Sequence, residues 1–264
     1  MVAFTDRLIE ANQAVWEAMA AHPFVLGLAR GTLPDSALQA WVQQDRIFVV
    51  EERRVVAALR VHGLSSRLDD LLADLDRGLV EEAEAFTRTA AEHGFAAEVE
   101  PWPVCLGYTS YLRCAAHEGA LEGLTALYAA ERAYLDTWTA VAERSPADSA
   151  YHAWIQNWSG ETFRAFVADL GRDLDELAGT PPPVLAHRLG VLFARAARFE
   201  LAFWEMCWSS QARLGGRGSK RSQAIQVCPV PILRKSRRPP RPGGREVALA
   251  ARLGVLPIEV VDVR

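Results

Sequence analysis

The sequence predicts an all-helical bundle of about seven or eight helices. Apolar residues recur at helical spacing through the first 212 residues, and no run there alternates in the manner of a β-strand. Gly and Pro residues interrupt these periodic segments where helices are expected to end. The chain has 264 residues, of which 50% are apolar, so it can bury one sizeable core. We therefore expect one helical domain over residues 1–212.

The expected helices follow one another along the chain. The first ends at His22, because the residue before a proline is driven out of helical geometry. In the helix over residues 66–93 the leucines are expected to face inward and the acids outward. The expected helical segments are residues 3–21, a short turn at 24–29, residues 34–61 and 66–93, the helices around Tyr108, Glu131 and Trp154, and residues 184–212.

The helix that contains Glu131 has an acid in the centre of its apolar stripe. Residues 124–138 are rich in Ala and Leu and lack Gly and Pro. At about 100° per residue, Leu127, Tyr134 and Trp138 share a face with Glu131. A carboxylate that faces a core costs several kcal/mol unless it is paired, hydrogen-bonded or protonated. Glu131 is therefore either a structural hydrogen-bond node or a site residue with a shifted pKa.

Two further helices repeat this pattern. Asp45 lies in the middle of an apolar face, and Glu200 is at the centre of another in the last long helix. Glu52 lies two turns beyond Asp45 on the same face, and we expect it to be structural. The fourth helix adds two inward aromatic residues, Tyr108 and Tyr111. Three helices that each direct an acid into a shared interior predict a polar pocket inside the bundle.

Other common catalytic signatures are missing from the sequence. None of the six His residues has an acid three positions before it, which disfavours a di-metal bundle site, so we expect no metal. No phosphate-binding Gly loop, dinucleotide fingerprint or Gly-x-Ser-x-Gly motif is present, so we expect no cofactor. The four Cys residues lack a C-x-x-C spacing and are interpreted as reduced thiols: Cys105, Cys114, Cys207 and Cys228.

Charge is distributed unevenly along the chain. Residues 211–264 carry twelve Lys and Arg against three Asp and Glu, while the remaining residues carry seventeen against thirty. The acidic body disfavours nucleic acid or an anionic membrane as its ligand. Residues 213–264 are rich in Gly, Pro and Arg, so we interpret them as a largely disordered, solvated tail. The alternative is a basic arm that binds nucleic acid.

The N-terminal segment lacks the apolar run of a signal peptide, and no segment reaches the roughly 18 apolar residues that span a bilayer. Together with the reduced thiols, these observations favour a cytoplasmic location without a membrane partner.

Four segments carry a resemblance to a known family: HPFVLGLARGTL from His22, GYTSYL from Gly107, YHAWIQNW from Tyr151 and FELAFWEMC from Phe199. Their order and spacing resemble those of the thiaminase II (TenA) family over roughly residues 4–210. The resemblance implies the haem-oxygenase-like helical fold without haem. It also implies a pyrimidine-binding site used in thiamin breakdown and salvage, and a homo-oligomer.

The resemblance also implies roles for the acids found above. The family's pyrimidine-binding Asp corresponds to Asp45, its ring-stacking Tyr to Tyr108, and its catalytic acid on the last helix to Glu200. The family's later Tyr is replaced by Trp158, so its hydroxyl is missing here. The resemblance places these further residues in the substrate pocket: Phe48, Tyr134, Trp158 and Phe203.

The sequence departs from the commoner branch of the family at the nucleophile. Ala130 occupies the position of the catalytic Cys, and Glu131 follows it. This arrangement resembles the Glu-type branch, which is associated with hydrolysis of aminopyrimidines rather than of thiamin. The expected function is therefore an aminopyrimidine aminohydrolase, or a deformylase of the N-formyl amine, with Glu131 and Glu200 as the acid and base.

Two alternatives remain open from the sequence. One is another enzyme of the same fold, such as a metal or cofactor-free oxidase. The other is a non-catalytic pyrimidine-binding protein, since one fold hosts many functions.

Overall fold

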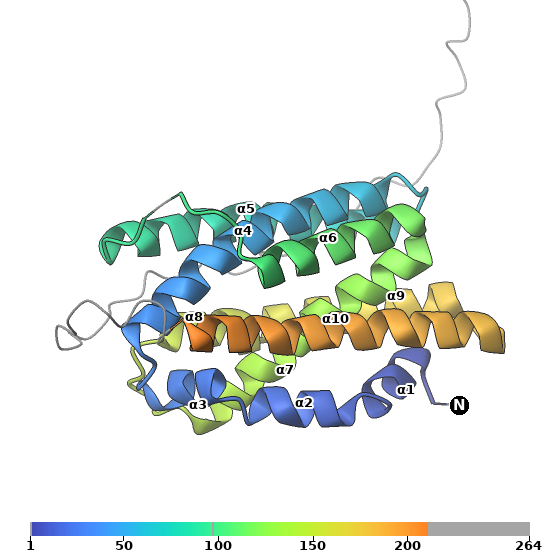
Figure 1. Ribbon diagram of the computed structural model, residues 1–264. Helices are drawn as coiled ribbons and strands as arrows, with labels where there is room; N and C mark the ends of the chain where they lie inside the picture. The colour runs from blue at the N-terminus through green and yellow to red at the C-terminus, as the bar shows by residue number, and fades with distance from the viewer. Residues whose placement is uncertain (1, 97, 211–264) are drawn as a thin grey trace, which may run out of the picture.

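The computed structural model describes residues 2–96 and 98–210, and these residues form an all-helical bundle (Figure 1). The predicted fold class is confirmed, and the described residues contain helices and no strand. The helices are α1 (Phe4–Glu10), α2 (Gln13–Ala20), α3 (Pro23–Arg30), α4 (Asp35–Arg60), α5 (Ser66–Glu92), α6 (Pro103–Glu118), α7 (Ala120–Arg144), α8 (His152–Ser159), α9 (Glu161–Ala178) and α10 (Pro183–Ser209).

The helices lie in layers around the two long helices α7 and α10. In Figure 1, α4, α5 and α6 run along one side of the bundle, and α1 to α3 run along the opposite side. Helix α10 lies between these two groups, and it packs against α7, α6 and α4 as well as α2 and α3. Helix α7 contacts seven other helices, so its side chains reach the centre of the molecule.

The described residues form more helices than the sequence predicted, because two expected helices are divided. The expected helix over residues 3–21 is interrupted at Asn12, whose side-chain amide donates a hydrogen bond of 2.8 Å to the Leu8 carbonyl. Such a bond offers the backbone an alternative to helix continuation. A second break, at Gly160, separates α8 from α9. The expected tail at 213–264 lies outside the described residues.

A cluster of aromatic side chains fills one end of the bundle. The Trp41 ring on α4 lies 4.7 to 5.8 Å, centroid to centroid, from the rings of Trp138, Trp154, Trp158 and Phe86. Aromatic pairs at such distances contribute about 0.5–1.5 kcal/mol each beyond the area that they bury. The cluster therefore joins α4, α5, α7 and α8 into one packed block.

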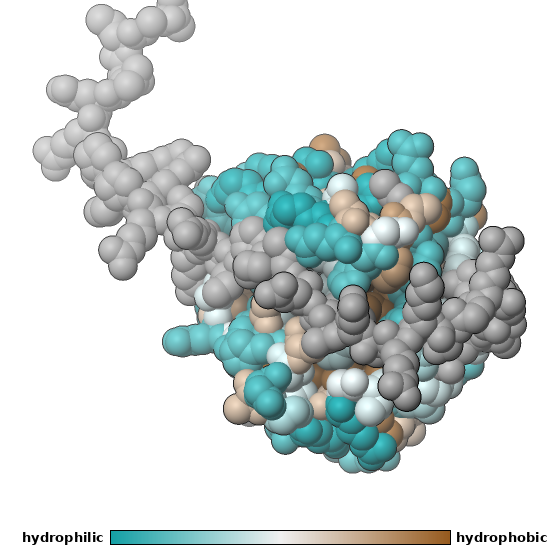
Figure 2. Space-filling view, turned by 90° about the vertical axis from the view of Figure 1, so that its left-hand side faces the viewer, coloured by the Kyte–Doolittle hydropathy of each residue, from teal (hydrophilic) through white to brown (hydrophobic). Residues whose placement is uncertain are grey.

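Hydrophilic residues make up most of the visible surface in Figure 2, and hydrophobic residues appear in small groups among them. Within the described ranges, no helix combines the length and apolar character needed to cross a membrane.

Gly123 allows α7 to approach α6 closely. A Cβ atom there would lie 2.6 Å from the Ala116 Cα atom and from a Leu59 methyl group. We predict that Gly123→Ala lowers the Tm by several °C, because overpacking a tight contact costs about 1–3 kcal/mol. Gly190 on α10 is the matched control, because a Cβ there meets only Leu8 at 4.0 Å.

Gly190→Ala should leave the Tm unchanged or raise it, since Ala is the better helix former by about 1 kcal/mol. Thermal unfolding followed by circular dichroism measures both variants. Equal shifts in the two variants would contradict the close packing at Gly123.

Candidate active site

One pocket inside the bundle is lined by residues of seven helices, α4 to α10. Five carboxyl groups line it: Asp45, Glu52, Glu82, Glu131 and Glu200. Six aromatic side chains form much of the remaining wall: Phe48, Tyr108, Tyr134, Trp158, Phe163 and Phe203. No lysine, arginine or histidine of the described residues is among the lining side chains.

The structure brings together all eight residues that the sequence singled out. Asp45, Glu131 and Glu200 come from α4, α7 and α10, and they meet in this one pocket. The five binding residues expected from the resemblance line the same pocket: Phe48, Tyr108, Tyr134, Trp158 and Phe203. Their positions therefore suit a shared site, while their individual roles stay predictions.

Asp45 is held by a tyrosine from the facing helix. The Tyr134 hydroxyl on α7 donates a hydrogen bond of 2.7 Å to Oδ2 of Asp45. Burial raises the pKa of Asp45 to about 7, and the bond from Tyr134 opposes this rise only in part. Asp45 therefore exchanges its proton near neutral pH.

Glu52 and Glu131 form a pair of carboxyl groups across α4 and α7. Their residues are 5% and 7% exposed, and their side chains are hydrogen-bonded to each other. Burial raises the pKa of Glu131 to about 8 and that of Glu52 well above its ordinary value, and the neighbouring carboxyls add to both shifts. The hydrogen bond between them raises the pKa of Glu52 and lowers that of Glu131, so Glu52 is the donor and Glu131 the acceptor. Glu52, which we expected to be structural, lines the pocket beside Glu131, and its role stays a prediction.

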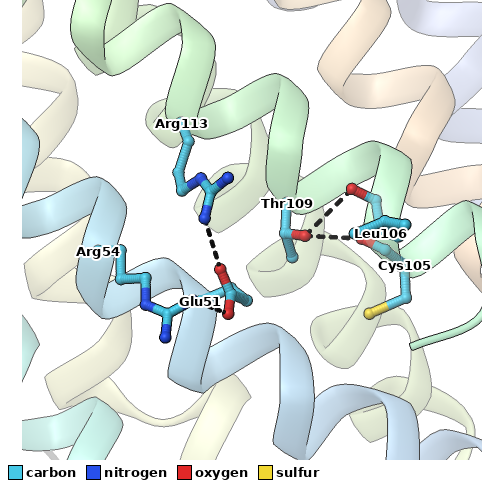
Figure 3. Close-up of polar contacts among 6 residues, drawn as sticks. All are labelled: Glu51, Arg54, Cys105, Leu106, Thr109 and Arg113. Atoms are coloured by element: carbon cyan, nitrogen blue, oxygen red, sulfur yellow. Dashed lines mark hydrogen bonds and ion pairs between the residues drawn. The ribbon is translucent and has the colours of Figure 1, made fainter. Parts of the chain in front are cut away.

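The adjacent residue Glu51 shows what an ordinary acid does in this fold. Its side chain turns to the outer side of α4, where it pairs with Arg54 and accepts a 3.1 Å bond from Arg113 on α6 (Figure 3). On α6 the Thr109 hydroxyl bonds to the Cys105 carbonyl at 3.0 Å, within its own helix. Glu51 is thus neutralised by two arginines, whereas Glu52 one position later faces the acid-lined pocket.

Glu200 on α10 lies close to Tyr108 on α6. Burial raises the pKa of Glu200 to about 8, with a further rise from Asp45 that the Tyr108 hydroxyl opposes. The Tyr108 side chain is fully buried, and its hydroxyl has no well-formed hydrogen bond within the described ranges. One face of its ring stacks on Phe199, with centroids 5.4 Å apart. The hydroxyl therefore interacts with the Glu200 carboxyl without ideal hydrogen-bond geometry.

Glu82 on α5 is the pocket acid that sequence reasoning missed. We expected the acids of this helix on its outer face, and the structure corrects this for Glu82. Its Oε1 atom accepts hydrogen bonds from Trp158 Nε1 at 3.0 Å and from Asn157 Nδ2 at 3.4 Å. Burial raises the pKa of Glu82 to about 8 despite these bonds.

A periodicity signal for Glu82 was present in the sequence. Positions 75, 79, 82 and 86 share one face of a helix, and the other three positions carry Leu, Leu and Phe. An acid in that row breaks an apolar stripe in the same way as Glu131 does.

The buried thiols do not contribute to the pocket wall. Burial raises the pKa of Cys105 to about 12 and that of Cys207 well above its ordinary value, so both are protonated at neutral pH. Ala130 lines the pocket beside Glu131. The described residues contain no group of three or more His, Cys, Asp and Glu arranged to hold a metal ion.

The chemistry that this pocket supports is proton transfer to and from a flat, polar ligand. Three of its glutamates have pKa values of about 8, close to the operating pH that suits general acids and bases. The aromatic walls offer stacking surfaces for a flat ring. Fold and site together define a helical-bundle protein with an internal acid-base site.

The chain belongs to the TENA/THI-4/PQQC family, whose model matches residues 9–210. It is 26% identical over 218 residues to the aminopyrimidine aminohydrolase of Halalkalibacterium halodurans, covering 80% of this chain and 97% of that protein. It is 25% identical over 214 residues to the aminopyrimidine aminohydrolase of Bacillus subtilis, covering 79% and 91%.

Solved structures agree with this assignment. A TenA homologue from Pyrococcus furiosus superposes with a TM-score of 0.74 at 29% identity, covering 78% of this chain and all of that one. A domain with a haem-oxygenase-like fold from Shewanella denitrificans has a TM-score of 0.62 at 14% identity, covering 83% and 98%. The second likeness confirms the expected haem-oxygenase-like fold.

The raised pKa of Glu200 makes stability depend on pH. Its pKa is 4.5 ordinarily and about 8 in the folded protein, so the fold binds this proton more tightly than the unfolded chain does. Its contribution to the free energy of unfolding is complete below the unfolded pKa and is lost as the pH rises through about 8. Gln stays neutral at every pH. We therefore predict that the Tm of Glu200→Gln, measured relative to that of the wild type, rises by a few °C as the pH increases from about 5 to about 9.

Thermal unfolding at several pH values measures this difference. The exposed residue Glu143 on α7 gives the control, since Glu143→Gln should show the same difference in Tm at every pH. If the difference in Tm between Glu200→Gln and the wild type did not change with pH, the Glu200 carboxyl would be solvated or paired with a cation.

Proposed function

We propose that this protein is an aminopyrimidine aminohydrolase, which converts an aminomethyl-pyrimidine to the hydroxymethyl-pyrimidine and ammonia. A closely related activity, removal of an N-formyl group from the same amine, fits the same groups. The proposal rests on one observation: Glu131 and Glu200, both with pKa values of about 8, line the same pocket. Ala130, which stands where the commoner branch of the family has its catalytic Cys, lines this pocket too. Relatives named aminopyrimidine aminohydrolases match over most of their length.

The pocket supports binding of a flat heteroaromatic ring. Asp45, positioned by Tyr134, would hydrogen-bond the amidine edge of a pyrimidine through its second oxygen. The Tyr108 ring would stack on the substrate, with its hydroxyl near Glu200 as a further contact. Phe48, Phe203 and Trp158 would complete the apolar wall.

The hydrolysis needs one base and one acid. Water adds to the carbon that bears the amine, and the C–N bond breaks with its electron pair moving to nitrogen. One of Glu131 and Glu200, as carboxylate, takes a proton from the water, and the other donates its proton to the leaving amine. Each such proton transfer contributes about 10²–10⁴ in rate. Glu52 supports this role of Glu131 by sharing a proton with it.

The same observations support placing the chain in the Glu-type branch of the family. Covalent attack by a thiolate is not part of this proposal, because Ala130 lines the pocket and the buried Cys105 and Cys207 do not. We also propose that the protein works in the cytoplasm as a homo-oligomer, as the resemblance implied.

Ammonia release from the aminomethyl-pyrimidine, the formylated amine and thiamin, measured in parallel, tests the proposal. We predict that Glu131→Gln and Glu200→Gln each lose at least about 10²-fold in kcat/KM on one of the first two substrates. Glu143→Gln should retain wild-type activity, because this acid is exposed on α7.

Comparable rates for all four proteins would end the proposed mechanism. Tight aminopyrimidine binding without ammonia release would identify a binding protein, and activity that depends on added iron or manganese would identify an oxidase of the same fold.

A further inference from the structure

Glu82 lines the pocket, and one of its two carboxyl oxygens has no hydrogen-bond partner among the described residues. Both donors that reach it, Trp158 Nε1 and Asn157 Nδ2, bond to Oε1. No hydrogen bond or ion pair to Oε2 is present within residues 2–96 and 98–210, and the residue is partly exposed although it lines an interior pocket. Gly78 lies one turn earlier on the same face of α5, so no side chain from that position covers Glu82.

Two acids that lie outside the pocket, one buried and one half-buried, have cationic partners. Asp173, 4% exposed, is paired with Arg67, and Asp136 accepts a 2.7 Å bond from Arg132. In contrast, no cationic side chain of the described residues lines the wall that carries Glu82. A cationic ligand would bring a positive charge into this pocket and so favour the ionised form of an acid beside it.

We propose that Glu82 is the residue that selects a cationic amine, binding the ammonium group of the substrate through Oε2 while Trp158 and Asn157 hold Oε1 in place. This inference rests on the proposed function. It further specifies that the substrate amine binds as a cation and that it lies against the pocket wall formed by Glu82. A primary aliphatic amine is an ammonium ion at neutral pH, so a substrate bound in this form already carries the proton that its nitrogen needs to leave, and the glutamate acid would donate one only to an amine that has lost it. A charge-assisted hydrogen bond to a carboxylate is about twice as strong as a neutral one.

Binding of the amine is then linked to release of protons. The groups that face Glu82 through the pocket are Asp45 and Glu52 on α4, Glu131 on α7 and Glu200 on α10, with the Tyr108 and Tyr134 hydroxyls. From α8 and α9 the pocket receives Trp158 and Phe163, which do not titrate. At pH 7 Glu82, with a pKa of about 8, carries a proton that an entering ammonium ion would displace. The neutral hydroxymethyl product would not displace this proton.

Isothermal titration calorimetry in two buffers of different ionisation enthalpy measures both affinity and protons released. The parent protein is full-length Glu200→Gln, whose slow turnover lets the aminomethyl-pyrimidine be titrated as a ligand beside the hydroxymethyl-pyrimidine. Adding Glu82→Gln should weaken amine binding about 10-fold to 100-fold and reduce the protons released. Binding of the neutral alcohol should change by less than about 3-fold.

The exposed acid Glu84 on the same helix gives the matched control, and Glu84→Gln should alter neither ligand's affinity. Unchanged amine affinity in Glu82→Gln, or an equal loss for amine and alcohol, would overturn the inference and leave the proposed function intact. A parent protein that binds neither pyrimidine would instead contradict the proposed function itself.

The parent protein also supplies a test that does not depend on whether Glu82→Gln folds. Amine binding at pH 7 must release more protons than alcohol binding does, because both ligands meet Asp45 through the same ring and only the amine brings a positive charge to Glu82. Amine binding that releases no more protons than alcohol binding would overturn the inference.

Discussion

Five carboxyl groups share the interior of one helical bundle, and no lysine, arginine or histidine of the described residues lines the pocket with them. Removing a carboxylate from water without a counter-charge is costly, so burial keeps these groups protonated near neutral pH. Glu82, Glu131 and Glu200 accordingly have pKa values of about 8, and Asp45 one of about 7. Groups that exchange protons at these values are suited to acid and base catalysis in the cell.

The packing around the pocket holds this unfavourable arrangement in place. The aromatic block centred on Trp41 packs four helices together, and Trp158 in that block also bonds to Glu82. Gln44, next to Asp45, bonds to the Glu100 carbonyl and accepts from the Trp102 backbone, which fixes the start of α6. These contacts position the acids without neutralising them, as expected where a fold gives up stability for function.

The sequence was informative where one side chain breaks a periodic pattern. Glu131 and Glu200 each interrupt an apolar stripe, so helical periodicity alone predicted that they face the interior, and the resemblance added their catalytic roles. Periodicity could not show which other groups meet them across helices, because contacts such as Glu52 with Glu131 depend on packing. Glu82 was overlooked because α5 carries many acids, and the one on its inner face was grouped with those on the outer face.

NMR titration of the glutamate side chains, with the carboxyl carbons labelled, shows directly whether the pocket acids are buried without a counter-charge. The account predicts a small set of glutamates that titrate near pH 8, well above the ordinary value of 4.5. One signal should disappear from this set in each of Glu82→Gln, Glu131→Gln and Glu200→Gln. If all glutamates titrated near their ordinary value, the carboxyl groups would be solvated or paired with cations, and the account of an uncompensated acidic pocket would be wrong.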